Sequence, residues 1–337
     1  MTDSKGALKS ITLELRRELE GRHDATGDWQ PGDLERCLAA IGVRRDRAPV
    51  PVDELPHLSA NDREARTVVE AFVRSHAEAG GSREAALAAF VRESAYTWAN
   101  RLLALRCMEA RGLIDEVILQ KEIYGGRSLQ HQRLARREPE RCSGEDEGLL
   151  AALFDEFARR GKELPLLFDP KAPEVALRPS VAGLKRCIAL LSGTVTANGE
   201  EPAPDAVFSA ADALGWAYQY WNTEEKSRVF EKVRTKKGAK IEGAEIIPAT
   251  CIYTEPYMVK FLVQNSLGAT WMGINPGTRL CDGWQYYVRD TDRRLVPNKA
   301  VSDVTFLDPA CGSGHFLIEA FDLFYAMYVE EGTITEP

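Results

Sequence analysis

The sequence predicts an α/β protein, in which a mainly α-helical N-terminal domain is followed by the first strand, turn and helix of an open parallel sheet. The first 205 residues consist largely of amphipathic segments of helical length. From residue 248 onward, glycine, proline and strand-like stretches become more frequent. Residues 304–332 then combine a short β-branched run, a glycine turn and an apolar helix, which is the opening unit of such a sheet.

Length and composition predict a soluble protein of more than one domain. The 337 residues exceed what one hydrophobic core usually holds. The net charge of -8 disfavours a surface that grips DNA everywhere, although it is compatible with a local basic groove. There is no apolar run of membrane-spanning length. The seven cysteines are scattered without a C-x-x-C pair, which predicts reduced thiols, no zinc site and a cytoplasmic location.

The longest helical segment of the N-terminal region covers residues 82–112. Trp98, Leu102 and Leu105 recur on one face of it, and Gly112 is a plausible stop. The pattern predicts one long helix or two helices in sequence. A turn-rich stretch at 198–206 is expected to close the helical region.

The glycine turn near the C-terminus is the most informative stretch. Residues 304–307, VTFL, predict a buried strand that ends at Asp308, and PACGSG supplies the turn. The following helix should end at Gly332. Its expected buried face consists of Leu317, Ala320, Phe321, Phe324 and Tyr328.

The residues of this turn suit a ligand that carries positive charge. Gly312 and Gly314 allow backbone conformations that a side chain forbids, and they let a ligand approach closely. The carboxylate of Asp308 can accept hydrogen bonds from a cationic or hydroxylated group. A Walker loop is excluded because no lysine follows the glycines, and a dinucleotide fingerprint is excluded because Leu317 replaces its third glycine.

The nine residues DPACGSGHF resemble the D-P-x-x-G-x-G-x-F motif of amino-type DNA methyltransferases. The resemblance implies a Rossmann-like class I methyltransferase fold and S-adenosyl-L-methionine as the cofactor. It implies that the aspartate and the glycine backbone contact the methionine end of the cofactor and that the phenylalanine walls the pocket. His315 and Cys311 stand at variable positions and are interpreted as structural. The cofactor residues implied by this motif are Asp308, Pro309, Ala310, Gly312, Gly314 and Phe316.

A second segment, residues 248–268, resembles the F/Y-T-P element that contacts the cofactor from the other side in this family. Tyr253 and Thr254 match its aromatic residue and its threonine, whereas Pro256 comes one residue late. We expect Thr254 to cap the helix that follows and Gly268 to end it. The expected buried pairs of this helix are Met258 with Leu262 and Val259 with Val263.

The order of several segments resembles the PglX-type adenine-specific DNA methyltransferases of BREX phage-defence systems, with DISARM and type IIG restriction-modification methylases as close relatives. LGWAYQYW, VQNSLGATWM, GWQYYV and FLDPACGSGH carry the resemblance, which covers residues 90–332. It implies adenine-N6 methylation of double-stranded DNA by direct methyl transfer to a flipped-out base. It also implies other defence-system proteins as partners, and the lack of an apolar run of spanning length predicts no membrane partner.

The amine-binding motif of this family, [DNS]-P-P-[YFW], is missing, because no Pro-Pro pair occurs in the chain. No catalytic residue is therefore assigned. We expect a truncated N-terminal part of such an enzyme, cut after its first cofactor motif, with an exposed strand and an exposed helix face. The expected domains are a helical region at 1–205, a helical linking segment with the upstream motif at 206–300, and the incomplete start of the methyltransferase domain at 301–337.

Two other interpretations stay open, a catalytically inactive DNA-binding or assembly subunit and a methyltransferase acting on protein amides. The missing amine motif favours the inactive subunit, and the long helical N-terminus favours DNA over a protein substrate. Two basic stretches, residues 228–240 and 131–141, either contact DNA phosphates or form ordinary solvated faces, and their sequences favour solvated faces. The five histidines show no metal-binding spacing.

Overall fold

The computed structural model describes residues 4–194, 205–289, 297 and 299–334. Most of the turn-rich stretch predicted at 198–206 lies outside the described residues. The chain divides into two compact units, Met1–Trp221 and Asn222–Pro337, which are described separately below as the N-terminal unit and the C-terminal unit. The three domains expected from the sequence, 1–205, 206–300 and 301–337, differ from these two units and remain a prediction.

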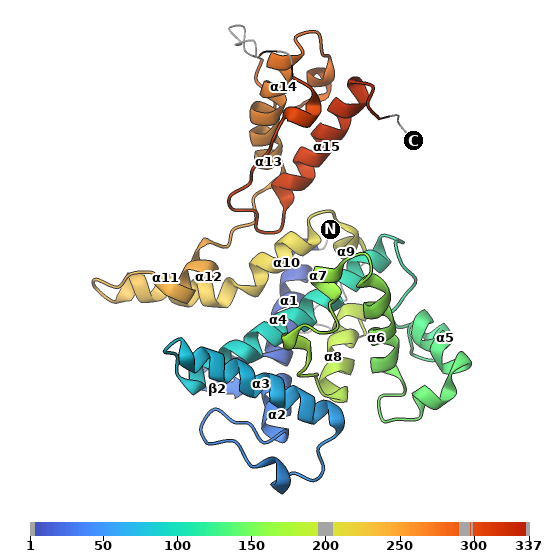
Figure 1. The fold of residues 1–337 in the computed structure, drawn as a ribbon, viewed down its shortest axis with the longest axis vertical. Helices are drawn as coiled ribbons and strands as arrows, with labels where there is room; N and C mark the ends of the chain where they lie inside the picture. The colour runs from blue at the N-terminus through green and yellow to red at the C-terminus, as the bar shows by residue number, and fades with distance from the viewer. Residues whose placement is uncertain (1–3, 195–204, 290–296, 298, 335–337) are drawn as a thin grey trace. The chain divides into compact units, whose positions relative to one another are not determined.

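One helix, α4 (Arg83–Ala110), organises the N-terminal unit, and α1, α2, α3, α8, α9 and α10 all contact it (Figure 1). The Ser82 side chain caps its first turn by accepting a hydrogen bond from the Ala85 N–H. Of the two expected alternatives, the structure has one long helix, and the expected glycine stop is confirmed because Gly112 follows its C-terminal end at φ 68°. Side chains on every side of α4 are buried, which is typical of a helix in the middle of a core.

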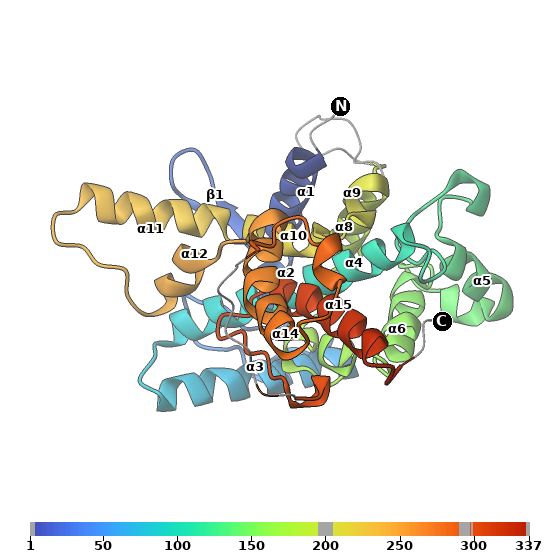
Figure 2. The same cartoon turned by 90° about the horizontal axis from the view of Figure 1, so that it is seen from above.

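The other elements of the N-terminal unit surround α4 or extend from it, as Figure 2 shows from a second direction. Two short antiparallel strands, β1 (Gly21–His23) and β2 (Trp29–Pro31), form a hairpin after the first helix. The helices are α1 (Ser4–Leu19), α2 (Asp33–Ala40), α3 (Ala60–Glu78), α5 (Leu129–Arg137), α6 (Leu149–Arg160), α7 (Pro165–Phe168), α8 (Val181–Ser192), α9 (Asp205–Ser209) and α10 (Ala213–Trp221).

The C-terminal unit is also helical in its described residues. Its helices are α11 (Thr223–Thr235), α12 (Ile246–Thr250), α13 (Pro256–Val263), α14 (Ala269–Ile274) and α15 (His315–Glu330), and a π-helical turn (Gln264–Gly268) joins α13 to α14. A small apolar core holds α13, the π turn, α14 and α15 together. Its fully buried members are Val259, Val263, Leu267, Trp271, Ile274, Val301, Ala320, Leu323 and Met327.

The strand predicted at 304–307 does not form in the structure. Residues 304–308 have no regular secondary structure and follow a 3₁₀ turn (Val301–Asp303), and Leu307 is 84% exposed. A strand is defined by hydrogen bonds to a neighbour, and the described residues provide none beside this segment. The chain is thus mainly helical, and a Rossmann-like sheet stays a prediction.

The helix after the glycine turn forms as expected, but two of its five predicted buried residues are exposed. Gly332 at φ 76° follows its last turn, as expected. Ala320 is buried and Phe324 and Tyr328 pack against the core, whereas Leu317 is 41% and Phe321 is 67% exposed. Leu323 and Met327 take their places, because the core lies on the side of the helix that faces α13.

Candidate functional site

The glycine turn has the backbone conformation that its sequence predicts. Gly312 and Gly314 lie in the left-handed region, at φ 52° and 79°. The turn is closed by a hydrogen bond from the Gly314 N–H to the Cys311 carbonyl at 2.8 Å, and α15 begins at the next residue. A side chain at either glycine would strain the backbone, since L-residues rarely adopt this conformation. No atom lies within 4 Å of where a Cβ of Gly314 would be, so the space beside the turn is open.

Asp308 lies directly before the turn, and its two carboxylate oxygens have different surroundings. Its Oδ1 accepts a hydrogen bond from the Ala310 N–H at 3.0 Å, which fixes the side chain over the turn. Its Oδ2 is buried and accepts no hydrogen bond from the described residues. A buried carboxylate oxygen without a donor is costly, so this oxygen is suited to a donor or cation brought by a ligand.

A hollow of about 250 Å³ lies beside this carboxylate. Three of the predicted cofactor residues line it, namely Asp308, Pro309 and Phe316. The rest of the lining comes from Phe306, Leu307 and, on the other side, Leu262, Val263 and Ser266. Pockets that bury a small molecule usually measure about 300 to 1,000 Å³, so this hollow is large enough for only part of such a molecule.

The upstream segment meets the glycine turn through two aromatic rings. Tyr253, which is 8% exposed, stacks on His315 with the ring centroids 4.9 Å apart and the planes 7° from parallel. The Tyr253 hydroxyl lies 3.4 Å from Nε2 of His315, and Nδ1 of His315 is buried without a hydrogen-bond partner among the described residues. The structure thus brings the two predicted cofactor segments together, and a histidine at a variable motif position joins them.

The remaining predicted site residues lie around these contacts. Pro309, Ala310 and Gly312 are exposed at the turn, and Thr254 is half-buried next to Tyr253. Thr254 does not cap the following helix, because Glu255 occupies the N-cap position and Pro256 the first turn. The family's proline spacing would begin the helix one residue earlier, and the later proline shifts the start accordingly.

We expected Gly268 to end the helix, but the structure shows that it does not. It has an ordinary helical φ of -60°, and the chain continues through it into α14. Its small size serves another purpose, since a Cβ at this position would lie 2.7 Å from the ring of Trp284. Of the expected buried pairs, Val259 and Val263 are buried, whereas Met258 and Leu262 are 44% and 50% exposed.

The sequence analysis missed the residues of α13 and the π turn that face the glycine motif. Leu262 and Ser266 line the hollow one helical turn apart, a spacing that could have indicated a shared face. The extra residue of a π turn changes which side chains face outward, and such turns are frequent at functional sites. Here Gln264 accepts from the Tyr286 N–H at 2.9 Å, and Asn265 accepts from the Val288 N–H at 2.8 Å.

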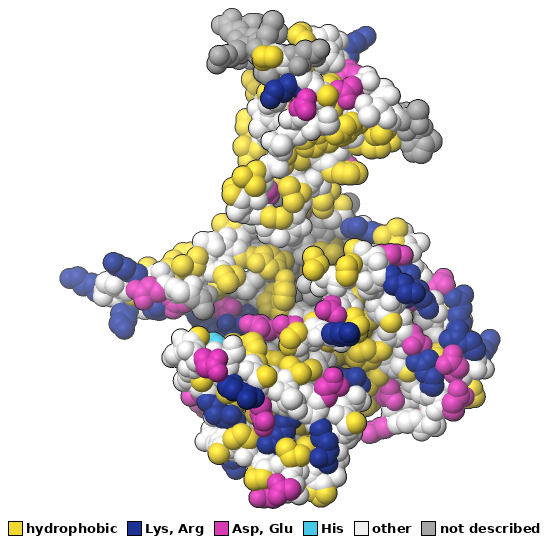
Figure 3. All heavy atoms as spheres, in the orientation of Figure 1, with side chains coloured by type: hydrophobic (Ala, Val, Ile, Leu, Met, Phe, Trp, Pro, Cys, Tyr) yellow, Lys and Arg dark blue, Asp and Glu magenta, His cyan; other side chains and the backbone are white. Residues whose placement is uncertain are grey.

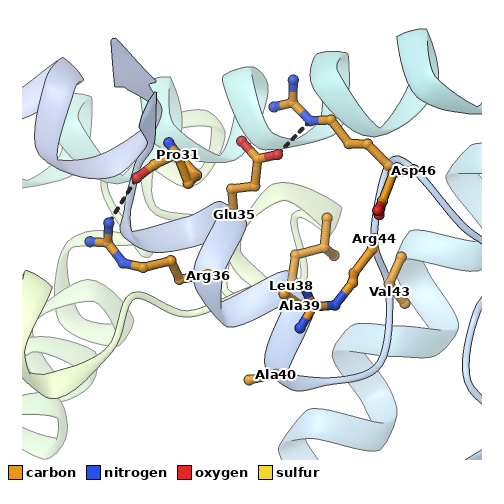
Figure 4. A pocket seen from close by; sticks show the side chains of 10 residues that line it. Pro31, Glu35, Arg36, Leu38, Ala39, Ala40, Val43, Arg44 and Asp46 are labelled. Carbon is orange, nitrogen blue, oxygen red and sulfur yellow. Dashed lines mark hydrogen bonds and ion pairs between the residues drawn. The ribbon is translucent and has the colours of Figure 1, made fainter. Parts of the chain in front are cut away.

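A larger hollow of about 570 Å³ lies in the N-terminal unit beside α2 (Figure 4). It contains none of the residues predicted from the sequence. Its polar groups are largely engaged within its own walls, since Glu35 pairs with Arg45 at 2.9 Å and Arg36 donates to the Pro31 carbonyl at 2.7 Å. We therefore place the candidate site at the glycine turn.

In the part of the chain that the structure describes, two further kinds of feature are absent. His, Cys, Asp and Glu side chains do not gather there in groups of three or more that could hold a metal ion. None of the described helices has the length and apolar character needed to cross a membrane. Near the turn, burial raises the pKa of Glu319, and the charge of Lys260 opposes that shift.

The site thus has the form of a glycine turn that opens a helix, with an acidic residue before it and an aromatic residue packed across it. No protein-family model matches the chain. It is 28% identical to adenine-specific methyltransferase BrxX of Escherichia coli O9:H4 (strain HS) over 278 residues, which cover 74% of this chain and 22% of that protein.

The chain is also 28% identical to adenine-specific methyltransferase PglX of Lacticaseibacillus casei (strain Zhang), over 285 residues that cover 73% of this chain and 23% of that protein. The predicted resemblance to PglX-type adenine-specific methyltransferases is thereby confirmed. The aligned part of the chain spans less than a quarter of the length of either relative.

Proposed function

We propose that this chain carries the cofactor-binding side of an S-adenosyl-L-methionine-dependent DNA adenine-N6 methyltransferase of a BREX-like phage-defence or restriction-modification system, acting on double-stranded DNA in the cytoplasm. The names of the two relatives support a methyltransferase that acts on adenine. The observation that carries the proposal is the packing of Tyr253 on His315, since it joins the two segments that the family uses to hold its cofactor.

The residues at the turn fit the amino-acid end of this cofactor. Asp308 offers a buried carboxylate oxygen with no hydrogen-bond donor among the described residues, and the cofactor has a cationic amino group. Gly312 and Gly314 leave room for close approach to the backbone. Phe316 lines the hollow from α15 and would form an apolar wall. When bound, the cofactor supplies the electrophilic methyl group.

The adenine side of the site requires polypeptide outside these 337 residues. The Pro-Pro motif that receives the target amine is absent from the sequence. The outer face of α15 is apolar and exposed at Ile318 (59%) and Phe321 (67%), as the helix of a Rossmann-like unit would be before a sheet covers it. Both observations support a site completed by further polypeptide, and other defence-system proteins are the partners we propose.

Titration calorimetry of the full chain with S-adenosyl-L-methionine and its demethylated product tests the proposal. We expect heat of binding with both, and a loss of at least about tenfold in affinity for Asp308→Asn, because a charge-assisted hydrogen bond contributes about 1.5 to 3 kcal/mol. The matched control is Asp322→Asn, which removes an exposed carboxylate from α15. Absence of heat with both compounds would contradict the proposal.

The missing amine motif favours a second candidate, a catalytically inactive DNA-binding or assembly subunit, and a protein amide methyltransferase is a third. Incubation with cofactor labelled in its methyl group separates them. Label on unmodified DNA supports the DNA methyltransferase, and label on protein supports the third candidate. Cofactor binding without transfer by the chain alone is expected of both the first and the second candidate, because the amine-binding motif is absent. The assay is therefore repeated with added polypeptide that carries this motif, and continued absence of label then supports the inactive subunit.

A further inference from the structure

The helical hairpin at the start of the C-terminal unit carries a cluster of basic residues. We call residues 223–250, from α11 through α12, the basic arm. Between residues 226 and 240 it has one acidic residue, Glu231. The chain as a whole has a net charge of -8, so the arm has the opposite sign. The basic residues of this stretch are Lys226, Arg228, Lys232, Arg234, Lys236, Lys237 and Lys240.

The basic residues on the helical part of the arm are partly neutralised by acids of the same unit. Arg234 pairs with Glu231 at 2.6 Å. Lys232 pairs at 2.7 Å with Glu245, which lies in the 3₁₀ turn before α12. The three lysines beyond the helix differ from them. Lys236, Lys237 and Lys240 are exposed, and none of the ion pairs or hydrogen bonds between described side chains involves their ammonium groups.

The backbone gathers these lysines at one end of the arm. The helix α11 ends at Thr235, and a tight turn follows, closed by a hydrogen bond from the Ala239 N–H to the Lys236 carbonyl at 3.0 Å. Gly238 permits the turn with φ 81°, and no atom lies within 4 Å of its Cβ position. Figure 3 shows Lys and Arg side chains clustered at the end of this hairpin.

The arm is fixed at its base. Lys226 donates to the Cys251 carbonyl at 3.1 Å, and Lys232 binds both carboxylate oxygens of Glu245, at 2.7 and 2.8 Å. These contacts hold α11 against α12 and leave the turn that carries the free lysines at the far end. A fixed support lowers the entropy lost when the tip binds a partner.

The other basic stretch considered from the sequence, residues 131–141, lacks this property. Arg133 pairs with Asp115, and Arg137 pairs with Glu138. Arg141 pairs with Asp155 at 2.8 Å and with Glu138 at 2.9 Å. The structure therefore distinguishes two stretches that look alike in sequence. Three of the four arginines of residues 131–141 form ion pairs, Arg136 being the exception, whereas the three lysines at the tip of the basic arm form none with described side chains.

We propose that Lys236, Lys237 and Lys240 at the tip of the basic arm contact the phosphate backbone of double-stranded DNA. The inference rests on the proposed function for its substrate. Exposed ammonium groups without acidic partners displace counterions from DNA and contribute affinity without reading the sequence. An anionic membrane is the less suitable partner, because the lysines cluster at a tip rather than along the polar face of a long amphipathic helix.

The test measures binding of the full chain to a labelled DNA duplex over a range of salt concentrations. Each neutralised phosphate contributes about 0.9 to the slope of log K against log salt, so changing all three lysines to glutamine should make the slope shallower by about 2 to 3. Affinity at low salt should fall at least tenfold. The matched control changes Arg133, Arg137 and Arg141 to glutamine, with the same loss of charge, and should leave the slope unchanged.

Three results would overturn the proposal: no binding of the duplex by the unmodified chain, equal slopes for the unmodified chain and the lysine variant, or equal losses in the lysine variant and its arginine control. Lysine-dependent binding to phosphatidylserine vesicles without binding to DNA would also overturn it. Calorimetry with S-adenosyl-L-methionine on the same variant tells the two proposals apart, because the tip lysines are absent from the glycine turn and cofactor affinity should be unchanged.

Discussion

Two long helices of the described residues, α4 and α15, are buried to very different extents. In α4, side chains on all sides are enclosed, and Trp98, Leu102 and Leu105 have no exposed surface. In α15, a single stripe containing Leu323 and Met327 is buried, and the opposite face is exposed. Helix α4 is thus enclosed by its own unit, whereas α15, next to the candidate site, has an exposed apolar face.

The difference extends to how each helix is held. The core around α4 includes aliphatic side chains and packed aromatic rings, among them Trp98, Phe154 and Phe157. The C-terminal end of α15 is held by polar contacts, since Glu330 accepts hydrogen bonds from Trp271 at 2.8 Å and from Thr278 at 2.7 Å. Packing gives the N-terminal unit its stability, and a few directional bonds supplement a small core in the C-terminal unit.

The largest expected effect comes from Trp98→Ala in the full chain. The indole is fully buried and donates to the Leu177 carbonyl at 3.0 Å, so its removal should cost about 3 to 5 kcal/mol of unfolding free energy. Denaturant unfolding measures the loss, and hydrogen exchange in α4 localises it. The matched variant is Phe321→Ala in α15, which should cost less than about 0.5 kcal/mol at an exposed position. Similar costs for both variants would remove the contrast between the helices.

The next effect is a pH dependence of stability that arises from Glu109 in the N-terminal unit. Burial raises the pKa of Glu109 to about 7, although N–H groups of Ile118 and Val117 donate to it and lower the pKa. Between the unfolded pKa of about 4.3 and the folded value, the folded chain holds a proton that the unfolded chain has lost. This contribution to stability is therefore present at low pH and is lost as the pH rises through this window, by about 4 kcal/mol.

Glu109→Gln should flatten this dependence, which unfolding midpoints measured from pH 5 to pH 8 would show, with about 1.4 kcal/mol expected per unit of pKa shift. The control is Glu84→Gln, an exposed position in the first turn of the same helix, which should keep the slope. Hydrogen exchange in the peptide containing residues 105–119 reports the stability of the N-terminal unit around Glu109 directly. An unchanged slope in the Glu109 variant would show that other groups cause it.

A smaller effect is expected from Glu330→Ala, which removes the acceptor for both Trp271 and Thr278. Hydrogen bonds to a charged group contribute about 1.5 to 3 kcal/mol, and exposure of Glu330 to solvent lowers the expected cost to about 1 to 2 kcal/mol. Faster hydrogen exchange in α15 and α14 would reveal it, without change in α4. Asp322→Ala, on the exposed side of the same helix, should leave exchange unchanged. Equal exchange in both variants would mean that apolar packing alone holds α15.

Local signals in the sequence predicted the turn well. Gly312 and Gly314 were expected to adopt conformations forbidden to other residues, and both have positive φ. The long helix with its stop at Gly112 was also predictable, because spacing and capping are local properties. The buried face of α15 was not predictable in full. Many residues of this helix are apolar, so the sequence pattern alone does not select one face.

Contacts between distant segments could not be predicted from the sequence. The stacking of Tyr253 on His315 joins residues 62 positions apart, and nothing in either segment specifies it. Gly268 was predicted to end a helix by its residue type, whereas its position is determined by the ring of Trp284. The strand at 304–307 was predicted from composition, but a strand also needs a neighbour to bond with, which composition does not supply.

A single residue, Ile252, separates the Cys251 carbonyl that holds Lys226 from the Tyr253 ring that lies on His315. One inserted or deleted residue here would shift the chain by about 3.3 to 3.6 Å and break one of the two attachments. Among natural homologues, length changes should therefore occur in the loop at 236–242, where glycine and lysine face solvent, and be rare at 251–253.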